Sequence, residues 1–164
     1  MAGTEQSGRR GVEVVTSYLE ERGAPHEVVE HDQTFTAAAE AKASGVPPDH
    51  AAKTVVLRDG DAYRLAVIPA SHRLDLTKAR EALEATRHLR LATEAEMESD
   101  FEAFEVGALP PIGPMVPGPE ILDARLMEHD RILCAGGDHR HSLLVDPRDI
   151  SRLADARVAD ICQD

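Results

Sequence analysis

Disulfide-forming residues and long apolar runs are scarce in this sequence. Its 164 residues include only two cysteines, Cys134 and Cys162, which are too few for a disulfide-stabilised scaffold and fit a reducing compartment. No apolar run reaches the roughly 18 residues of a transmembrane helix. The first ten residues, MAGTEQSGRR, lack the apolar segment of a secretory signal. We therefore expect a cytoplasmic protein without a membrane partner.

Basic side chains are also under-represented. The 18 lysines and arginines are outnumbered by 30 acidic residues, which leaves a formal net charge of −12. Non-specific affinity for nucleic acid comes from basic side chains that displace counterions from phosphates. This balance excludes a broad nucleic-acid-binding surface. Any contact with nucleic acid should be local, or should depend on another protein that carries most of the affinity.

The length fits one domain with one hydrophobic core. Residues 1–10 are predicted to form a flexible tail and residues 11–164 a single domain, since no internal repeat, heptad pattern or low-complexity linker divides them. Apolar spacing and capping residues predict helices at about 11–22, 36–45, 77–83, from 93 and from 146. Strands are predicted at 26–31, 53–58, 62–69, 88–92, 131–135 and 142–145, with Gly136-Gly137-Asp138 joining the last two.

The alternation of predicted helices and strands along the chain indicates the fold class. The Asp-Gly-Asp turn at 59–61 makes a clear hairpin. Frequent hairpins and short helices predict an α+β protein, with a mixed, mostly antiparallel curved sheet flanked by helices. They fit such a fold better than a doubly wound sheet.

The segment from Val106 to Pro119 cannot be a regular helix or a central strand, because it holds five prolines and three glycines. Within it, loop 107–113 has a clear chemical use. Glycines let the backbone approach a ligand, and prolines hold the neighbouring amides in place. Rigid N–H donors can stabilise the charge that develops in ester hydrolysis without a side-chain nucleophile. Composition alone favours the alternative, a stiff surface connection.

Lys53 stands at the head of an otherwise apolar strand. Its ammonium can serve as a point charge for a phosphate or for a developing oxyanion beside that loop. The pattern alone favours a solvated lysine at a strand end, whose aliphatic stem covers the edge of the core.

Histidine spacing offers a rival site. His139 and His141 would share one face of an extended segment, with Asp138 adjacent and His129 nearby, which allows a metal-dependent hydrolase. The spacing is weakly specific, no His-Glu-x-x-His or Cys-x-x-Cys spacing occurs, and we expect neither a metal nor another cofactor.

Nucleophilic side chains have less support. Ser71 and His72 are neighbours in sequence, and such neighbours do not face each other as a nucleophile and its base must. No Gly-x-Ser-x-Gly motif or phosphate-binding Gly-Lys-Ser/Thr loop occurs. Cys134 lies in an apolar run and is expected to be a buried structural thiol.

Several short segments occur together in a recognisable order from about Val12 onward. They are Glu-His-Asp at 30–32, Gly-Val-Pro-Pro-Asp at 45–49 leading to Ala-Lys-Thr-Val-Val at 52–56, Leu-Asp-Leu-Thr-Lys at 74–78, loop 107–113, Gly-Gly at 136–137 and Val-Ala-Asp-Ile at 158–161. In this order and spacing the chain resembles the YbaK type of aminoacyl-tRNA deacylase, which is similar to the editing domain inserted in bacterial prolyl-tRNA synthetases.

The resemblance implies a sheet curled into a barrel-like body and a pocket for the aminoacylated 3′ end of tRNA. It implies that Lys53 holds the terminal adenosine or its phosphate, while the loop amides polarise the ester carbonyl. Water then attacks, helped by the ribose hydroxyl of the substrate. Members of the family clear alanine, cysteine or similar small residues from proline tRNA and a few other tRNAs. A free-standing trans-editing hydrolase, monomeric or weakly dimeric, with prolyl-tRNA synthetase as a possible partner, is the expectation.

On this basis Lys53 and Gly107 are the predicted catalytic residues. The predicted substrate-binding residues are Ala108, Leu109, Pro110, Pro111, Ile112, Gly113, Ser71, His72, Gly137, His139 and Ser142. The run from Asp138 to Ser142 departs from many relatives, which continue with a basic residue, Arg and Gly. This departure leaves open which residue completes the pocket wall. It also keeps a second hypothesis, a non-catalytic module that binds an amino acid or aminoacyl adenylate or docks on a synthetase.

Overall fold

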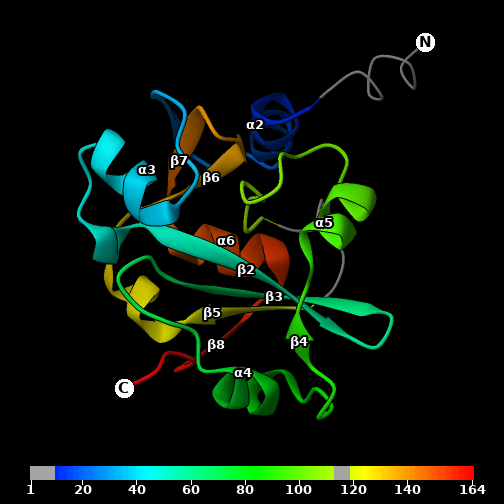
Figure 1. The fold of residues 1–164 in the computed structure, drawn as a ribbon. Coiled ribbons are helices and arrows are strands. Elements are labelled where there is room, and N and C mark those ends of the chain that lie inside the picture. The colour runs from blue at the N-terminus through cyan, green and yellow to red at the C-terminus, as the bar shows by residue number, and fades with distance from the viewer. Residues whose placement is uncertain (1–9, 113–118) are drawn as a thin grey trace.

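The computed structural model describes residues 10–112 and 119–164, and its strands form two sheets (Figure 1). The smaller sheet has the order β1-β7-β6 and is antiparallel throughout. The larger sheet has the order β4-β2-β3-β5-β8, in which β3–β5 and β5–β8 are parallel pairs. The bounds are β1 His26–Glu30, β2 Ala52–Asp59, β3 Ala62–Pro69, β4 Arg90–Leu91, β5 Glu120–Asp123, β6 Ile132–Asp138, β7 His141–Val145 and β8 Arg157–Ala159.

The predicted α+β class and the mixed, mostly antiparallel sheet are therefore confirmed. An isolated parallel bridge between Ala51 and Leu133 links the two sheets at the start of β2. Over the residues described, the sheets do not close into a complete barrel.

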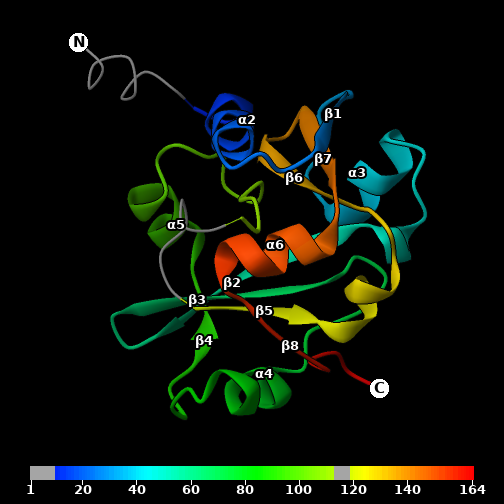
Figure 2. The same ribbon diagram turned by 180° about the vertical axis from the view of Figure 1, so that it is seen from behind.

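Helices cover both sheets and lie between them (Figures 1 and 2). They are α2 Val12–Glu21, α3 Ala37–Ala43, α4 Leu76–Leu83, α5 Glu94–Asp100 and α6 Pro147–Ala154, with 3-10 turns η1 Pro48–His50 and η2 Ala124–Glu128. The main core packs Leu19 of α2 and Ile150 of α6 against Leu143 of the small sheet and Leu122 of the large one. A second core places α4 on the other face of the large sheet. In the described part of the chain, no helix is long and apolar enough to cross a membrane.

The helix ends follow from local capping chemistry. The Thr36 side chain accepts a hydrogen bond from the Ala39 amide at the start of α3, and Gly45 follows its end with φ +71°. Thr93 and Glu96 form the predicted capping box of α5. These contacts satisfy backbone groups at the ends of α3 and α5 and so define where the two helices begin.

The predicted turn at residues 136–138 is wrong. Both glycines lie inside β6, at a register shift between Ala135 and Asp138, and the turn to β7 falls at residues 139–140. A Cβ on Gly136 would come within 2.7 Å of the His141 carbonyl oxygen, and one on Gly137 within 2.7 Å of the Gly11 carbonyl carbon. The glycines therefore permit close backbone approach at a bulge rather than chain reversal.

Candidate active site

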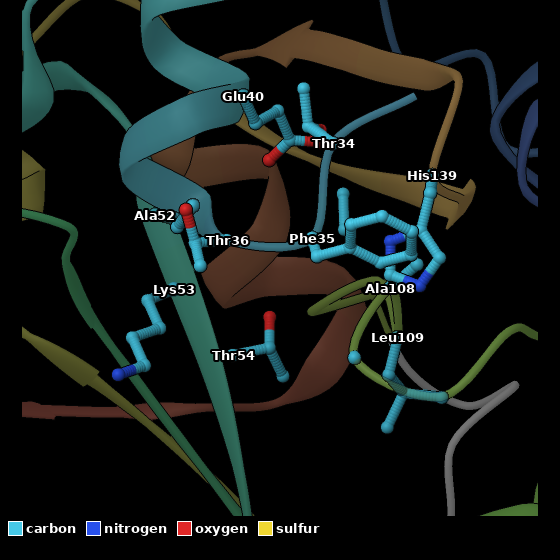
Figure 3. Close-up of a pocket in the computed structure, with 13 residues that line it drawn as sticks. Thr34, Phe35, Thr36, Glu40, Ala52, Lys53, Thr54, Ala108, Leu109 and His139 are labelled. Atoms are coloured by element: carbon cyan, nitrogen blue, oxygen red, sulfur yellow. The ribbon is translucent and has the colours of Figure 1, made fainter. Parts of the chain in front are cut away.

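A small pocket opens between the start of α3, the start of β2 and the loop that follows α5 (Figure 3). Its free volume is about 30 Å³. The lining comes from four segments: residues 34–37 with Glu40, residues 52–54, residues 107–109, and Ala135 with His139. Lys53 and Gly107, which are far apart in sequence, thus contribute to one cavity.

Lys53 lies on β2, paired with Ile68 of β3, and its side chain is exposed. No ion pair or hydrogen bond to its ammonium occurs within residues 10–112 and 119–164. Figure 3 shows the side chain directed away from Glu40, toward the outer side of β2. The ammonium is therefore available to an anionic ligand at the pocket rim.

A second cavity, of about 520 Å³, adjoins the pocket through Lys53, Thr54 and Gly107. Its walls are mainly apolar and include Leu91 of β4, which is 58% exposed. Arg73 adds a cationic side chain to this lining. The two cavities together form a continuous surface on either side of Lys53.

Hydrogen bonds to β6 hold the backbone around Gly107. The Glu105 amide donates to the Gly137 carbonyl at 3.0 Å, and the Gly137 amide donates to the Ala108 carbonyl at 3.0 Å. The Ala108 amide is engaged by the Glu105 carbonyl at 3.0 Å. By contrast, the Gly107 amide has no acceptor within the described parts of the chain. Of these loop amides, that of Gly107 is free for a ligand carbonyl.

An aromatic pair forms one side of the pocket. The rings of Phe35 and His139 have centroids 5.0 Å apart and are tilted by 49°. Phe35 is 69% exposed, whereas the Nε2 atom of His139 lies 2.8 Å from the Val106 carbonyl oxygen. The pair leaves an exposed aromatic face beside the opening.

Glu40 of α3 is a buried acidic residue in the pocket wall. Its Oε2 atom accepts a hydrogen bond from the Ser142 hydroxyl, and His31 Nε2 lies 2.8 Å from that same hydroxyl oxygen. Burial raises the pKa of Glu40 above its ordinary value, while the Ser142 hydrogen bond and the charge of His31 act in the opposite direction. Ser142 is fully buried and lies behind Glu40 rather than in the pocket lining.

Other predicted site residues lie outside the pocket lining. Pro110, Pro111 and Ile112, in the second half of loop 107–113, are buried, and Ile112 belongs to the main core. Gly137 packs closely on the Gly11 backbone, since a Cβ built on Gly137 would lie 2.7 Å from the Gly11 carbonyl carbon. Gly113 lies outside the described residues.

Ser71 and His72 form a pair of their own in the turn after β3. The Ser71 Oγ and His72 Nδ1 atoms are 3.0 Å apart, and neither residue lines the pocket. This contact is a local one at the surface, since Ser71 is exposed.

The alternative metal site at His139 and His141 does not assemble in this structure. His141 Nδ1 faces Asp138 at 2.8 Å, whereas His139 turns into the pocket. Within the described parts of the chain, the potential metal ligands that do come together are Asp49, His50 and His129, with ligand atoms within 4.8 Å of one another. That group lies outside the pocket lining.

Sequence reasoning missed Phe35, Glu40 and Thr54 in the pocket wall. The hydroxyl of Thr54 is buried without a hydrogen-bond partner in the described structure. One signal was present for Glu40, because it is the only acidic residue in the alanine-rich helix α3. Its contact with Ser142 joins residues 102 positions apart, so no local pattern reveals it.

Three solved structures are similar to this chain over most of its length. A proposed trans-editing enzyme for prolyl-tRNA synthetase is 31% identical, with a TM-score of 0.82 over 93% of this chain and 97% of its own. A scaffold protein from epitope grafting by computational design has 27% identity and a TM-score of 0.81, covering 93% and 97% of the two chains. The hypothetical protein APE2540 has 25% identity and a TM-score of 0.81, covering 91% and 99%.

One family model matches most of the chain. A model of the aminoacyl-tRNA editing domain matches residues 31–153, which include α3, β2, the Gly107 segment and both strands that flank the pocket from the small sheet. This chain therefore belongs to the aminoacyl-tRNA editing domain family.

Proposed function

We propose that this protein is a free-standing trans-editing deacylase that hydrolyses the ester of a mischarged tRNA. The observation that carries the proposal is that Lys53 and Gly107 line one pocket, and that neither the ammonium nor the amide has a partner among residues 10–112 and 119–164. Family membership and the similarity to a proposed trans-editing enzyme for prolyl-tRNA synthetase support the same activity. Prolyl-tRNA synthetase is the partner that we propose for it.

The pocket supports a small aminoacyl group. Its free volume of about 30 Å³ contrasts with about 520 Å³ in the adjoining cavity. We propose alanine or cysteine, carried on proline tRNA, as the amino acid removed. The terminal adenosine then occupies the larger cavity, where its base meets apolar walls and Lys53 meets the phosphate.

In this arrangement, the Gly107 amide donates to the carbonyl oxygen of the ester. A water molecule attacks the carbonyl carbon, and the negative charge that develops on the carbonyl oxygen is stabilised by that amide. The carbon–oxygen bond to the ribose then breaks, and the ribose oxygen takes up a proton released from the water. The neighbouring ribose hydroxyl assists the transfer of that proton. The products are the free amino acid and uncharged tRNA.

A panel of proline tRNAs carrying different amino acids tests this function. Purified protein should release alanine or cysteine from the tRNA, whereas leucyl and phenylalanyl esters should persist as in buffer. Electrophoresis under acidic conditions measures the charged fraction over time. Equal stability of every ester with and without the protein would count against deacylation.

The tRNA specificity needs a second comparison. Alanine is attached to proline tRNA and to alanine tRNA, and both esters are incubated with the protein alone and with prolyl-tRNA synthetase. Because the chain carries a net charge of −12, we expect the synthetase to raise the rate on proline tRNA. Faster hydrolysis of the correctly charged alanine tRNA would contradict the proposed substrate.

A further inference from the structure

Glu40 brings an acidic group into the pocket where an ester substrate would bind. Its side chain is 9% exposed, and Figure 3 shows the carboxylate directed into the space between Thr34, Thr36 and Thr54. The Oε2 atom is held from behind by Ser142. No donor within the described parts of the chain reaches the second oxygen, Oε1, which is therefore free to accept a hydrogen bond from a ligand.

Hydrogen-bond geometry restricts where protons can lie in the network of Glu40, Ser142 and His31. His31 Nδ1 donates to the Asp32 carbonyl at 2.8 Å, so Nε2 carries a proton only when the ring is cationic. When Ser142 donates to Glu40, its oxygen accepts from His31 Nε2, and the network holds a carboxylate and an imidazolium. The alternative arrangement, with a neutral carboxyl and a neutral ring, contains the same number of protons.

A cation in the pocket favours the first arrangement. The carboxylate then faces the ligand, while the imidazolium lies behind Ser142, where it is 2% exposed and outside the pocket lining. Two basic residues share the lining: the Lys53 ammonium points away from Glu40, and Nε2 of His139 lies 2.8 Å from the Val106 carbonyl oxygen. The inner end of the pocket therefore has the charge and the free acceptor for an ammonium group.

We propose that the Glu40 carboxylate binds the α-ammonium group of the aminoacyl ester, so that the pocket selects substrates with an unmodified amino terminus. This inference rests on the proposed deacylase function. An alanyl or cysteinyl ester has one cationic group in its aminoacyl part, the α-ammonium, and Glu40 is the acidic residue that lines the pocket. Binding there would anchor the amino acid at one end, opposite the Lys53 rim.

Alanyl-tRNA and N-acetyl-alanyl-tRNA test the inference as a matched pair, since acetylation removes the charge and leaves the ester intact. The wild-type protein should prefer the free amine by about 10- to 100-fold in kcat/KM, the range expected for one charge-assisted hydrogen bond. Glu40→Gln should lose most of this preference by slowing only the alanyl ester. Glu21→Gln, an exposed change on α2, should keep it.

Two results would overturn the role of Glu40. One is equal hydrolysis of both esters by the wild-type protein. The other is an equal loss of both activities in a folded Glu40→Gln variant, which would indicate a general base instead. Thermal melting establishes folding, and if that variant does not fold, Glu40→Asp replaces it. Asp retains the charge but places it one methylene farther from the ligand. We therefore expect a preference for the free amine between those of Glu40→Gln and the wild type. A preference equal to that of the wild type would contradict the inference.

Failure of the proposed deacylase function can be distinguished from failure of the proposed role of Glu40. If the wild-type protein hydrolyses neither ester, the proposed function fails, and binding is compared for alaninamide and N-acetyl-alaninamide. A rise in melting temperature with alaninamide alone, absent in Glu40→Gln, would still support an ammonium site. Equal shifts with both compounds, or no shift with either, would contradict it.

Discussion

Gly107 and the His139 ring lie next to each other on the two segments that form one side of the pocket. A Cβ built on Gly107 would lie 3.5 Å from Cε1 of the His139 ring, and Gly107 adopts φ +88°. The same ring approaches the Val106 carbonyl oxygen at 2.8 Å through Nε2. His139, at the turn after β6, thus orients the peptide that presents the Gly107 amide.

Gly107→Ala tests whether this backbone conformation matters. Alanine is strained at a positive φ, by roughly 1–2 kcal/mol, and relaxation would turn the amide away from the ester. We expect a loss of kcat of about 100-fold, the lower end of the range for removal of one oxyanion donor. Hydrolysis of alanyl-tRNA measures it.

Gly60→Ala is the matched control, because Gly60 also has a positive φ, +64°, and nothing lies within 4 Å of its added Cβ. This variant should lose comparable stability in urea but retain its activity. Equal activity in both variants would remove Gly107 from the mechanism.

Ser142→Ala should destabilise the fold. Ser142 is fully buried and joins Glu40 to His31. Removal of its hydroxyl leaves polar groups without a partner, which costs about 1–3 kcal/mol. Chemical denaturation measures this loss. An unchanged free energy of unfolding would show that the network contributes nothing to stability.

Glu120 should make stability fall as the pH rises. Glu120 lies on β5 and is 2% exposed. This burial raises its pKa to about 9 from the ordinary 4.5. Between these two pKa values, the folded state keeps a proton that the unfolded state releases. The protonated fold is therefore favoured below pH 4.5, and this advantage is lost progressively up to about pH 9, with a slope of at most about 1.4 kcal/mol per pH unit.

Glu120→Gln should remove that slope. The difference in free energy of unfolding between the variant and the wild type, measured by urea denaturation from pH 5 to 9, should grow in favour of the variant. A difference that does not change with pH would show that Glu120 ionises normally in the folded protein.

Local features of the fold were predictable, and long-range ones were less so. The Thr36 cap, the Thr93–Glu96 capping box and the β2–β3 hairpin depend on neighbours within a few residues. The parallel strands β5 and β8 were missed, because each is short and pairs with residues distant in sequence. For the bulge in β6, the sequence predicts a connection between two strands instead, since bulges and turns both use glycine.

The candidate site likewise has features that the sequence predicts and features that depend on long-range contacts. The resemblance singled out Lys53 and the Gly107 segment, and the structure brings both to one pocket. Composition could not reveal that Pro110 and Pro111 of the loop are buried. It also could not reveal that Glu40 meets Ser142, because this contact depends on how α3 lies against the small sheet.

Single-turnover hydrolysis of alanyl-tRNA carrying the proline anticodon by Lys53→Ala tests the central claim most directly. Lys42→Ala is the control, since Lys42 is an exposed lysine on α3 outside the pocket lining. If Lys53 anchors the substrate, its variant should lose about 10- to 100-fold in kcat/KM, the range for one hydrogen bond to a charged group, and Lys42→Ala should match the wild type. Full activity in a folded Lys53→Ala protein would contradict the proposed active site.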